Sequence, residues 1–331
     1  MKHFFVINPY SFRNQEKLKQ VCIDIEKSFP GKMDYIIYLS RYPRDAIAVV
    51  HHYISSCPEN EIVRVYAVGG DGILFDCLNG MVGFPNAELT NVPYGNDNDF
   101  IRAFGENKKD RFRDIKSLSL APSLPVDIIN CGSNYALIEI HIGLIGQTMI
   151  LAKEMFKTIP EKLLRNHVSK AYMFCMLRAL FNKNVMQQRY SMFMDGEDLS
   201  GNFCYLHAAN SACNGETFVP SPYARPDSGK LEVIYVNTTS KISILKSAGD
   251  YNEGLFEKHK IFERRQCRVL ELQSDDIMSV SMDGETFYAQ KIKLEIIPKG
   301  IKFFAPEGLS LVDYSYKAFA AADKQNGGNR K

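Results

Sequence analysis

Val68-Gly69-Gly70-Asp71-Gly72 decides the fold, because it joins an apolar, β-prone run (residues 63–67) to a helical stretch (residues 73–78). Three glycines in four residues let the backbone approach a ligand closely, and the helix N-terminus offers unpaired N–H groups to a phosphate. A glycine turn without a chemical role explains a lone G-G-x-G equally well. Asp71 favours phosphate, since a carboxylate beside bound phosphate makes sense mainly when a divalent cation bridges the two. No Walker A motif is present.

Around this loop, up to about residue 105, β-prone runs alternate with segments of helical period. This pattern is typical of βαβ units with a parallel sheet. The predicted strands cover residues 4–8, 34–39 and 62–68, with amphipathic helices between them. The loops that follow parallel strands meet at one edge of the sheet, where open α/β folds bind ligands.

A second polar loop, Pro93-Tyr94-Gly95-Asn96-Asp97-Asn98-Asp99-Phe100, also follows an apolar segment. By itself it is best interpreted as a capping loop, because Asn and Asp favour turns and helix N-caps. Its position favours a function. In a doubly wound sheet it lies at the same edge as the glycine loop and Asn8-Pro9-Tyr10-Ser11, so Asp71 and Asp99 are expected around one site.

The second half has a different pattern of predicted secondary structure. Beyond Ser117, many short β-prone runs are separated by turn residues, and two helices are predicted near 145–158 and 168–182. Pro122 and Pro125 mark a change of composition near 117–127, where we predict the domain boundary. A further helix is predicted over residues 311–322.

Composition excludes several classes of protein. The 331 residues carry 40 Lys and Arg against 38 Asp and Glu, a net charge of +2, so a general nucleic-acid partner is not expected. The eight cysteines form no C-x-x-C pair and suit a reducing cytoplasm. Residues 135–150 contain Glu139 and His141, which makes a membrane-spanning helix improbable. None of the seven histidines has metal-ligand spacing, so the isolated His141, His167 and His207 are interpreted as structural or surface residues.

Three motifs together suggest a family. G-G-D-G, then P-x-G-x-x-N-D-F, then a late D-G-E resemble the diacylglycerol kinase catalytic-domain family, which includes bacterial diacylglycerol kinases and sphingosine and ceramide kinases. The resemblance extends over nearly the whole chain. Its other matches are Asn8-Pro9-x-Ser11, Asp45-Ala46, Asn79-Gly80, Val126-Asp127, Asn210-Ser211, Pro220, Pro222-x-Ala224 and Gly229-x-Leu231.

The D-G-E string occurs twice, and Asp-Gly between β-prone runs is a hairpin turn by default. The copy at Asp195-Gly196-Glu197 has no counterpart in the family and is interpreted as a turn. The copy at Asp283-Gly284-Glu285 follows the Gly229-x-Leu231 run and precedes a closing strand, as in the family pattern. We therefore expect the second copy to be the functional one.

The resemblance implies an α/β plus β fold. It consists of an N-terminal NAD-kinase-like α/β domain, with a parallel-type sheet flanked by helices, and a C-terminal β-sandwich-like domain. The predicted domains are residues 1–122 plus 304–331 for nucleotide binding and 123–303 for the lipid substrate. The implied reaction transfers the γ-phosphoryl group of ATP to a hydroxyl of a diacylglycerol-like lipid, assisted by Mg²⁺, in the cleft between the domains.

The family pattern also implies roles for individual residues. Glu285, with Asp283 beside it, would accept the proton of the substrate hydroxyl. Asp71 and Asp99 would be catalytic and position Mg²⁺, and Asp227 would belong to a metal site in the second domain. The residues expected to bind the nucleotide are Asn8, Pro9, Tyr10, Ser11, Phe12, Ser40, Gly69, Gly70, Asp71, Gly72, Ile73, Gly95, Asn96 and Asn98.

Departures from the family pattern keep two alternatives open. Ile73 and Asn96 replace phosphate-side hydroxyl residues, Asp97 adds a negative charge, and Phe12 and Arg44 replace glycines. A degenerate member that binds nucleotide or lipid without turnover is the first alternative. The second is an NAD-kinase-like enzyme with a soluble acceptor. Ser228 departs from the family's D-D-G and leaves the second-domain metal open.

The expected partner is a lipid at a membrane surface. We predict peripheral contact without a transmembrane segment, and a homodimer is left open. Candidate membrane-facing cations are Lys153, Lys157, Lys162 and Arg165 near the two predicted helices.

Overall fold

The computed structural model describes residues 1–12, 14–29, 35–95, 98–159, 167–215 and 217–316. In the first half, strands alternate with helices as the periodicity predicts, although Asp34 of the second predicted strand lies outside the described residues. The elements are β1 (Lys2–Ile7), η1 (Pro9–Ser11), α1 (Gln15–Ser28), β2 (Tyr35–Leu39), α2 (Asp45–Ser56), β3 (Val63–Gly69), α3 (Asp71–Met81), β4 (Ala87–Pro93), η2 (Asp99–Phe104), α4 (Lys109–Arg113) and α5 (Ile115–Ser119).

The second half is rich in strands, and its two predicted helices are present as α6 and α8. Its elements are β5 (Ser123–Cys131), β6 (Asn134–Ala136), β7 (Glu139–Gly143), α6 (Leu144–Thr158), α8 (Val168–Leu180), α9 (Lys183–Met186), β8 (Arg189–Met194), β9 (Glu197–Asp198), β10 (Gly201–Ala209), β11 (Leu231–Asn237), α10 (Lys241–Asn252), η3 (Phe256–Lys258), β12 (Phe262–Cys267), β13 (Val269–Met282) and β14 (Glu285–Phe304).

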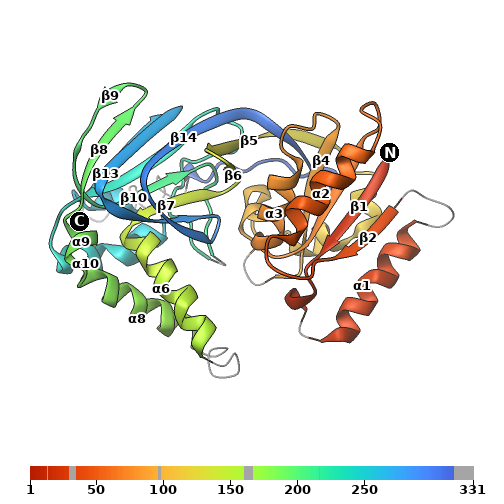
Figure 1. Cartoon of the computed structure of the whole chain (residues 1–331), viewed down its shortest axis with the longest axis horizontal. Coiled ribbons are helices and arrows are strands. Elements are labelled where there is room, and N and C mark those ends of the chain that lie inside the picture. Colours follow the sequence, from red (N-terminus) through yellow and green to blue (C-terminus); the bar gives the residue numbers. More distant parts are fainter. Residues whose placement is uncertain (13, 30–34, 96–97, 160–166, 216, 317–331) are drawn as a thin grey trace, which may run out of the picture.

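One path of paired strands runs through both halves, in the order β12-β11-β10-β7-β13-β14-β4-β3-β1-β2. The pairs β1–β2, β1–β3, β3–β4 and β4–β14 are parallel, whereas β14 is antiparallel to β13 and β5. Figure 1 shows β14 and β5 running from the second half into the first. The 20-residue β14 therefore belongs to both halves.

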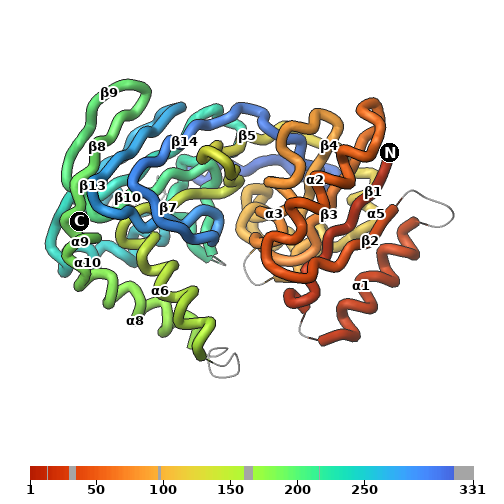
Figure 2. Tube along the Cα trace, in the orientation of Figure 1, coloured from red at the N-terminus to blue at the C-terminus, as the bar shows by residue number. Residues whose placement is uncertain are grey.

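The buried side chains form separate cores. The core of the first half includes Ile301 and Phe303 of β14, and also Val126 of β5. A second core lies among the strands of the other half, and a third lies where α6, α8 and α10 cover them. Figure 2 shows α6, α8 and α10 together on one side of the strands of the second half. The boundaries at 122/123 and 303/304 stay a prediction, since β5 and β14 contribute to both cores.

The C-terminal segment returns to the first half, but not as predicted over its whole length. Residues 311–314 are not helical: the Val312 N–H donates to the Ala103 carbonyl, and the buried Tyr314 hydroxyl donates to the Arg102 carbonyl. These bonds hold the segment against η2 and replace helical bonding. Residues 317–322 of the predicted helix lie outside the described part of the chain.

The two D-G-E copies form the same kind of turn. Asp195 and Gly196 have φ values of 50° and 86°, and Asp283 and Gly284 have 45° and 82°, as type I′ hairpins require. The carboxylates differ in surroundings. Asp195 is exposed and accepts from the Arg268 and Val269 N–H groups, whereas Asp283 is buried and accepts from three consecutive N–H groups, at residues 137–139.

This contrast gives a matched pair of substitutions. Asn-Gly also suits a type I′ turn, so Asp283→Asn keeps the turn while it removes one acceptor oxygen from three buried donors. We expect Asp283→Asn to lower the free energy of unfolding by about 1–3 kcal/mol, because buried donors lose their partner. Asp195→Asn, where water can replace the lost acceptor, should cost less. Urea denaturation measures both, and equal losses would contradict this account.

Candidate active site

The glycine loop after β3 and the loop after β4 are packed backbone to backbone. A Cβ added to Gly95 would lie 2.3 Å from Gly70 Cα, and one added to Gly69 would lie 2.9 Å from Ser11 Oγ. The Tyr94 N–H also donates to the Gly69 carbonyl, at 3.0 Å. The close approach therefore requires glycine at position 95, and it brings the two predicted loops together at the N-terminus of α3.

Asp71 and Asp99 meet at this crossing, as the sequence predicts. Asp71 lies in the first turn of α3, and both of its carboxylate oxygens accept from the Asp99 N–H, at 3.0 and 3.2 Å. The Asp99 carboxylate in turn accepts from the Gly215 N–H of the second half, at 2.7 Å. Arg102 reinforces this link by donating to the carbonyls of Gly215 and Phe218. The acidic pair is thus held between the two halves.

The loops after β1 and β2 lie at the same sheet edge. The Asn8 N–H donates to the Val68 carbonyl, and the Ser40 N–H donates to the Ile7 carbonyl. Asn8 also caps η1, since its side-chain oxygen accepts from the Tyr10 N–H. Among the remaining predicted nucleotide residues, Pro9 lies in η1, Tyr10 is exposed, and Phe12 contacts the Tyr94 ring.

Not every predicted residue of these loops faces outward. Asn98 is fully buried, has φ 55°, and donates to the Gly95 carbonyl, so it shapes the loop. Ile73 is buried against Gly69. Gly72 has open space where a Cβ would be. Asn96 and Asp97 lie outside the described residues.

Glu285 is held by two cations from different elements. Its Oε2 atom lies 2.8 Å from Lys153 Nζ of α6 and 3.4 Å from an Arg44 guanidinium nitrogen. Arg44 also lies over the Phe75 ring and pairs with Asp76, both on α3. Glu285, at the start of β14, is therefore connected through Arg44 to the helix that begins with Asp71.

Charge and backbone conformation are unusual around Arg44. Burial, with a smaller contribution from the nearby Glu285 carboxylate, raises the pKa of Asp76 to about 6, although Arg44 opposes the shift. Arg44 has φ 71°, a left-handed conformation that glycine adopts without strain. The arginine therefore occupies a position suited to glycine, and its guanidinium lies between two carboxylates.

Asp283 and Asp227, two other predicted site residues, have surroundings that differ from those of Glu285. Burial raises the pKa of Asp283 to about 7, although its backbone donors at residues 137–139 oppose the shift. Those donors hold the Asp283 carboxylate inside the hairpin that carries Glu285, and its catalytic role stays a prediction. Asp227 makes a two-point ion pair with Arg225, and among the described residues it belongs to no cluster of three metal-ligating side chains. The metal role predicted for Asp227 stays a prediction.

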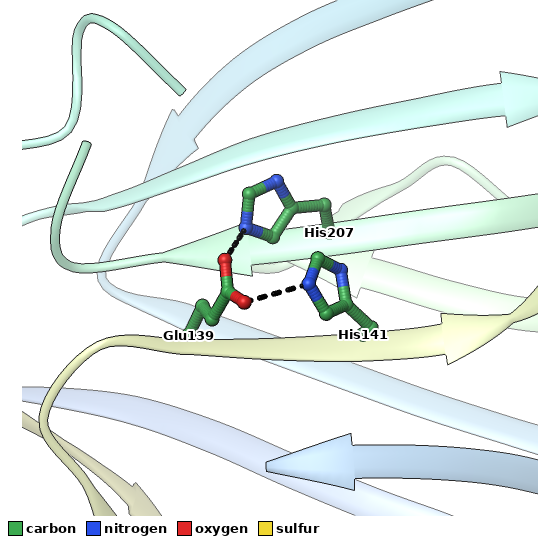
Figure 3. Close-up of side chains that lie close together, drawn as sticks. All are labelled: Glu139, His141 and His207. Atoms are coloured by element: carbon green, nitrogen blue, oxygen red, sulfur yellow. Dashed lines mark hydrogen bonds and ion pairs between the residues drawn. The ribbon is translucent and has the colours of Figure 1, made fainter. Parts of the chain in front are cut away.

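A buried cluster was missed by the sequence analysis (Figure 3). Glu139 and His141 of β7 and His207 of β10 come together, with His141 Nε2 and His207 Nε2 at 2.8 and 2.9 Å from the two Glu139 oxygens. Residues two apart on a strand share a face, and β7–β10 pairing sets His207 opposite His141. Glu139-x-His141 was the available signal, but the partner strand could not be identified locally. His141 and His207, which are isolated from each other in the sequence, are therefore buried neighbours in the structure.

Two family models match this chain. The diacylglycerol kinase catalytic domain matches residues 2–131, and the YegS C-terminal NAD kinase beta sandwich-like domain matches residues 156–305. The first match contains the glycine loop and Asp99, and the second contains Glu285.

Curated relatives and solved structures are similar to this chain over most of its length. A "Probable lipid kinase YegS-like" from Chromohalobacter salexigens is 26% identical over 77% of this chain and 80% of its own. A "Putative lipid kinase" from Staphylococcus haemolyticus is 24% identical over 80% of this chain and 84% of its own. The fold is similar to that of a "putative diacylglycerol kinase" from Bacillus anthracis, with a TM-score of 0.71, 17% identity, and coverage of 93% and 98% of the two chains. The chain belongs to the diacylglycerol kinase catalytic-domain family, and it carries the β-sandwich-like C-terminal domain of the YegS type.

Proposed function

We propose that this protein is an ATP-dependent kinase that transfers the γ-phosphoryl group to a hydroxyl of a diacylglycerol-like lipid. The observation that carries the proposal is the meeting of Asp71 and Asp99 at the Gly70–Gly95 crossing, beside the start of α3. The proposed active site is a cleft between an NAD-kinase-like first domain and the second domain. Family membership supports the transfer of phosphate to a lipid.

The residues at the crossing fit a nucleotide phosphate and Mg²⁺. The glycines leave the backbone of two loops uncovered by side chains, and the N-terminus of α3 favours negative charge. Carboxylate oxygens are the ligands that Mg²⁺ prefers, and it is commonly bound by one or two of them together with substrate phosphates. Asp71 and Asp99 would hold the ion. When bound, ATP with Mg²⁺ supplies an activated phosphoryl group with part of its charge neutralised.

Glu285 would act as the general base. Its side chain is partly exposed, and ion pairs with Lys153 and Arg44 hold its carboxylate at the start of β14. In the proposed reaction it takes the proton of the lipid hydroxyl while that oxygen forms a bond to the γ-phosphorus, and the bond from the γ-phosphorus to the bridging oxygen breaks so that ADP leaves. Asp283 fixes the hairpin that carries it.

An exposed apolar face on α8 would contact the membrane. Met173 and Phe174 are 52% and 57% exposed, and Leu177, Phe181 and Val168 are also exposed on or beside this helix. Clustered exposed apolar side chains commonly mark contact sites. Lys170 and Arg178 of the same helix supply charge that suits anionic lipid. Of the cations predicted for this role, Lys162 and Arg165 lie outside the described residues. No helix within the described ranges is long and apolar enough to cross a bilayer.

The kinase proposal predicts loss of turnover without loss of structure. Glu285→Gln removes the base while it keeps size and polarity, so kcat should fall by about 10²–10⁴-fold. Asp71→Asn should also reduce kcat, because it removes a negative oxygen ligand from the proposed Mg²⁺ site. The measurement is transfer of labelled γ-phosphate from Mg-ATP to lipid extract in detergent micelles.

Glu271→Gln is the matched control, because Glu271 is an exposed glutamate whose ion pair with Lys293 lies on β13 and β14. It should leave turnover unchanged. Folded wild-type protein that binds ATP but labels no lipid would refute the lipid kinase proposal. Labelling of NAD in its place would indicate a soluble acceptor, and labelling of neither would indicate a degenerate member.

The membrane proposal predicts that one charge on α8 weakens vesicle binding. Phe174→Glu removes an apolar side chain that the bilayer would bury, a contact worth at least about 1.5 kcal/mol. Partitioning to vesicles of phosphatidylcholine with phosphatidylserine should therefore fall about tenfold or more. Leu120→Glu is the control, since Leu120 is 82% exposed in the first half. Vesicle sedimentation measures both variants, and an equal effect of the two would rule out α8 as the contact.

A further inference from the structure

The Glu139–His141–His207 cluster is part of a closed ring of hydrogen bonds. His141 Nδ1 lies 3.0 Å from the Tyr205 hydroxyl, and His207 Nδ1 lies 2.8 Å from the Tyr251 hydroxyl. The two hydroxyl oxygens are 2.5 Å apart, which closes the ring from β7 through β10 and α10. All five side chains are buried. Each nitrogen and oxygen of the cluster is therefore oriented by a named neighbour.

The ring needs more hydrogens than neutral residues supply. Its five links require five hydrogens, one for each bond. With Glu139 ionised, two neutral imidazoles and two tyrosine hydroxyls supply only four. Without a further cation, the ring must hold an extra proton in a site that excludes water.

Asn214, beside Glu139 and His141, also lacks a consistent set of hydrogen-bond donors and acceptors. Its side-chain amide contacts a Glu139 oxygen closely and lies 3.1 Å from His141 Nε2. His141 Nε2 cannot donate to Glu139 and also accept from the Asn214 NH₂ group. With the amide turned over, the Asn214 oxygen would face the Glu139 oxygen instead. Both orientations leave lone pairs or donors opposed, and a cation between these groups would resolve the orientation in which the Asn214 oxygen faces Glu139.

We propose that Glu139, His141 and His207 bind a divalent transition-metal ion, with Zn²⁺ as the expected ion and the Asn214 side-chain oxygen as a fourth ligand. The three ligand atoms lie within 4.8 Å of one another. Two imidazoles and one carboxylate form a ligand set that suits Zn²⁺, and bonds of about 2.0–2.2 Å require only small movements of these side chains.

The tyrosines fit the surroundings that metal-bound histidines need. A histidine that binds metal through Nε2 usually donates its Nδ1 hydrogen to an oxygen, which fixes the ring and its tautomer. Tyr205 and Tyr251 supply those oxygens. With metal bound, three hydrogen bonds remain, and the two imidazoles and two hydroxyls supply enough hydrogens without an extra proton.

A metal ion bound to this cluster would hold two segments that contact the candidate active site. Asn214 precedes Gly215, whose N–H donates to the Asp99 carboxylate. The Glu139 backbone exchanges hydrogen bonds with Asp283, at the hairpin that carries Glu285. The ion would therefore be structural, it would touch no reacting atom, and its binding does not depend on the kinase proposal.

The test is metal binding by the full chain. Protein produced in zinc-supplemented medium and dialysed should contain close to one Zn²⁺ per chain by elemental analysis. Chelator-stripped wild type should take up Co²⁺ with the visible absorption of a four-coordinate nitrogen–oxygen site, and Zn²⁺ should raise its unfolding temperature. The cobalt spectrum is read on wild type, so it does not depend on how the variants fold.

Variants locate the ion. Glu139→Gln and His207→Gln should lose bound zinc. His259→Gln should retain it, although His259 also pairs with a carboxylate, that of Asp250. Asp71→Asn should retain it as well, which separates this site from the proposed Mg²⁺ site. Absence of Zn²⁺ and Co²⁺ binding by wild type, or zinc retained in both cluster variants, would overturn the proposal and leave a ring held by a proton.

Discussion

The pairing of β14 is the constraint on which the rest of the structure depends. Its N-terminal part pairs with β13, and its C-terminal part lies parallel to β4 in the first half. One continuous strand therefore carries Glu285 at one end and Phe303, in the core of the first half, at the other. Because strand register is set by the buried face, a slip of β14 would move both Glu285 and Phe303 to the wrong side. The position of Glu285, the proposed base, is thus coupled to the packing of the first half.

Electrostatics adds a second coupling between the halves. Arg44 joins Asp76 of α3 to Glu285, and Lys153 of α6 contacts the same Glu285 oxygen. The two basic side chains therefore orient the Glu285 carboxylate from two different elements. Arg44 contributes from a left-handed backbone position where a side chain is normally disfavoured. In that conformation the Arg44 side chain contacts two carboxylates and the Phe75 ring.

Local sequence predicted the first half well. Hydrophobic periodicity located its first three strands to within two residues and predicted the helices between them, and the glycine and Asn/Asp loops indicated one sheet edge for the predicted site. The meeting of Asp71 and Asp99 followed from topology alone, since both lie after neighbouring parallel strands. The helix expected over residues 311–322 was wrong at residues 311–314, because hydrogen bonds to Ala103 and Arg102 replaced local helical bonding.

By itself, the sequence determined the α/β order of the first half, the two polar loops after its strands and the family, because these depend on residue types at short spacing. Only the tertiary structure decided which D-G-E turn is buried, which cations hold Glu285, and that Glu139 and His141 meet His207, 68 residues after Glu139. These contacts depend on the pairing and register of distant strands. Propensity and periodicity describe a strand's faces, but they do not specify the strand that lies beside it.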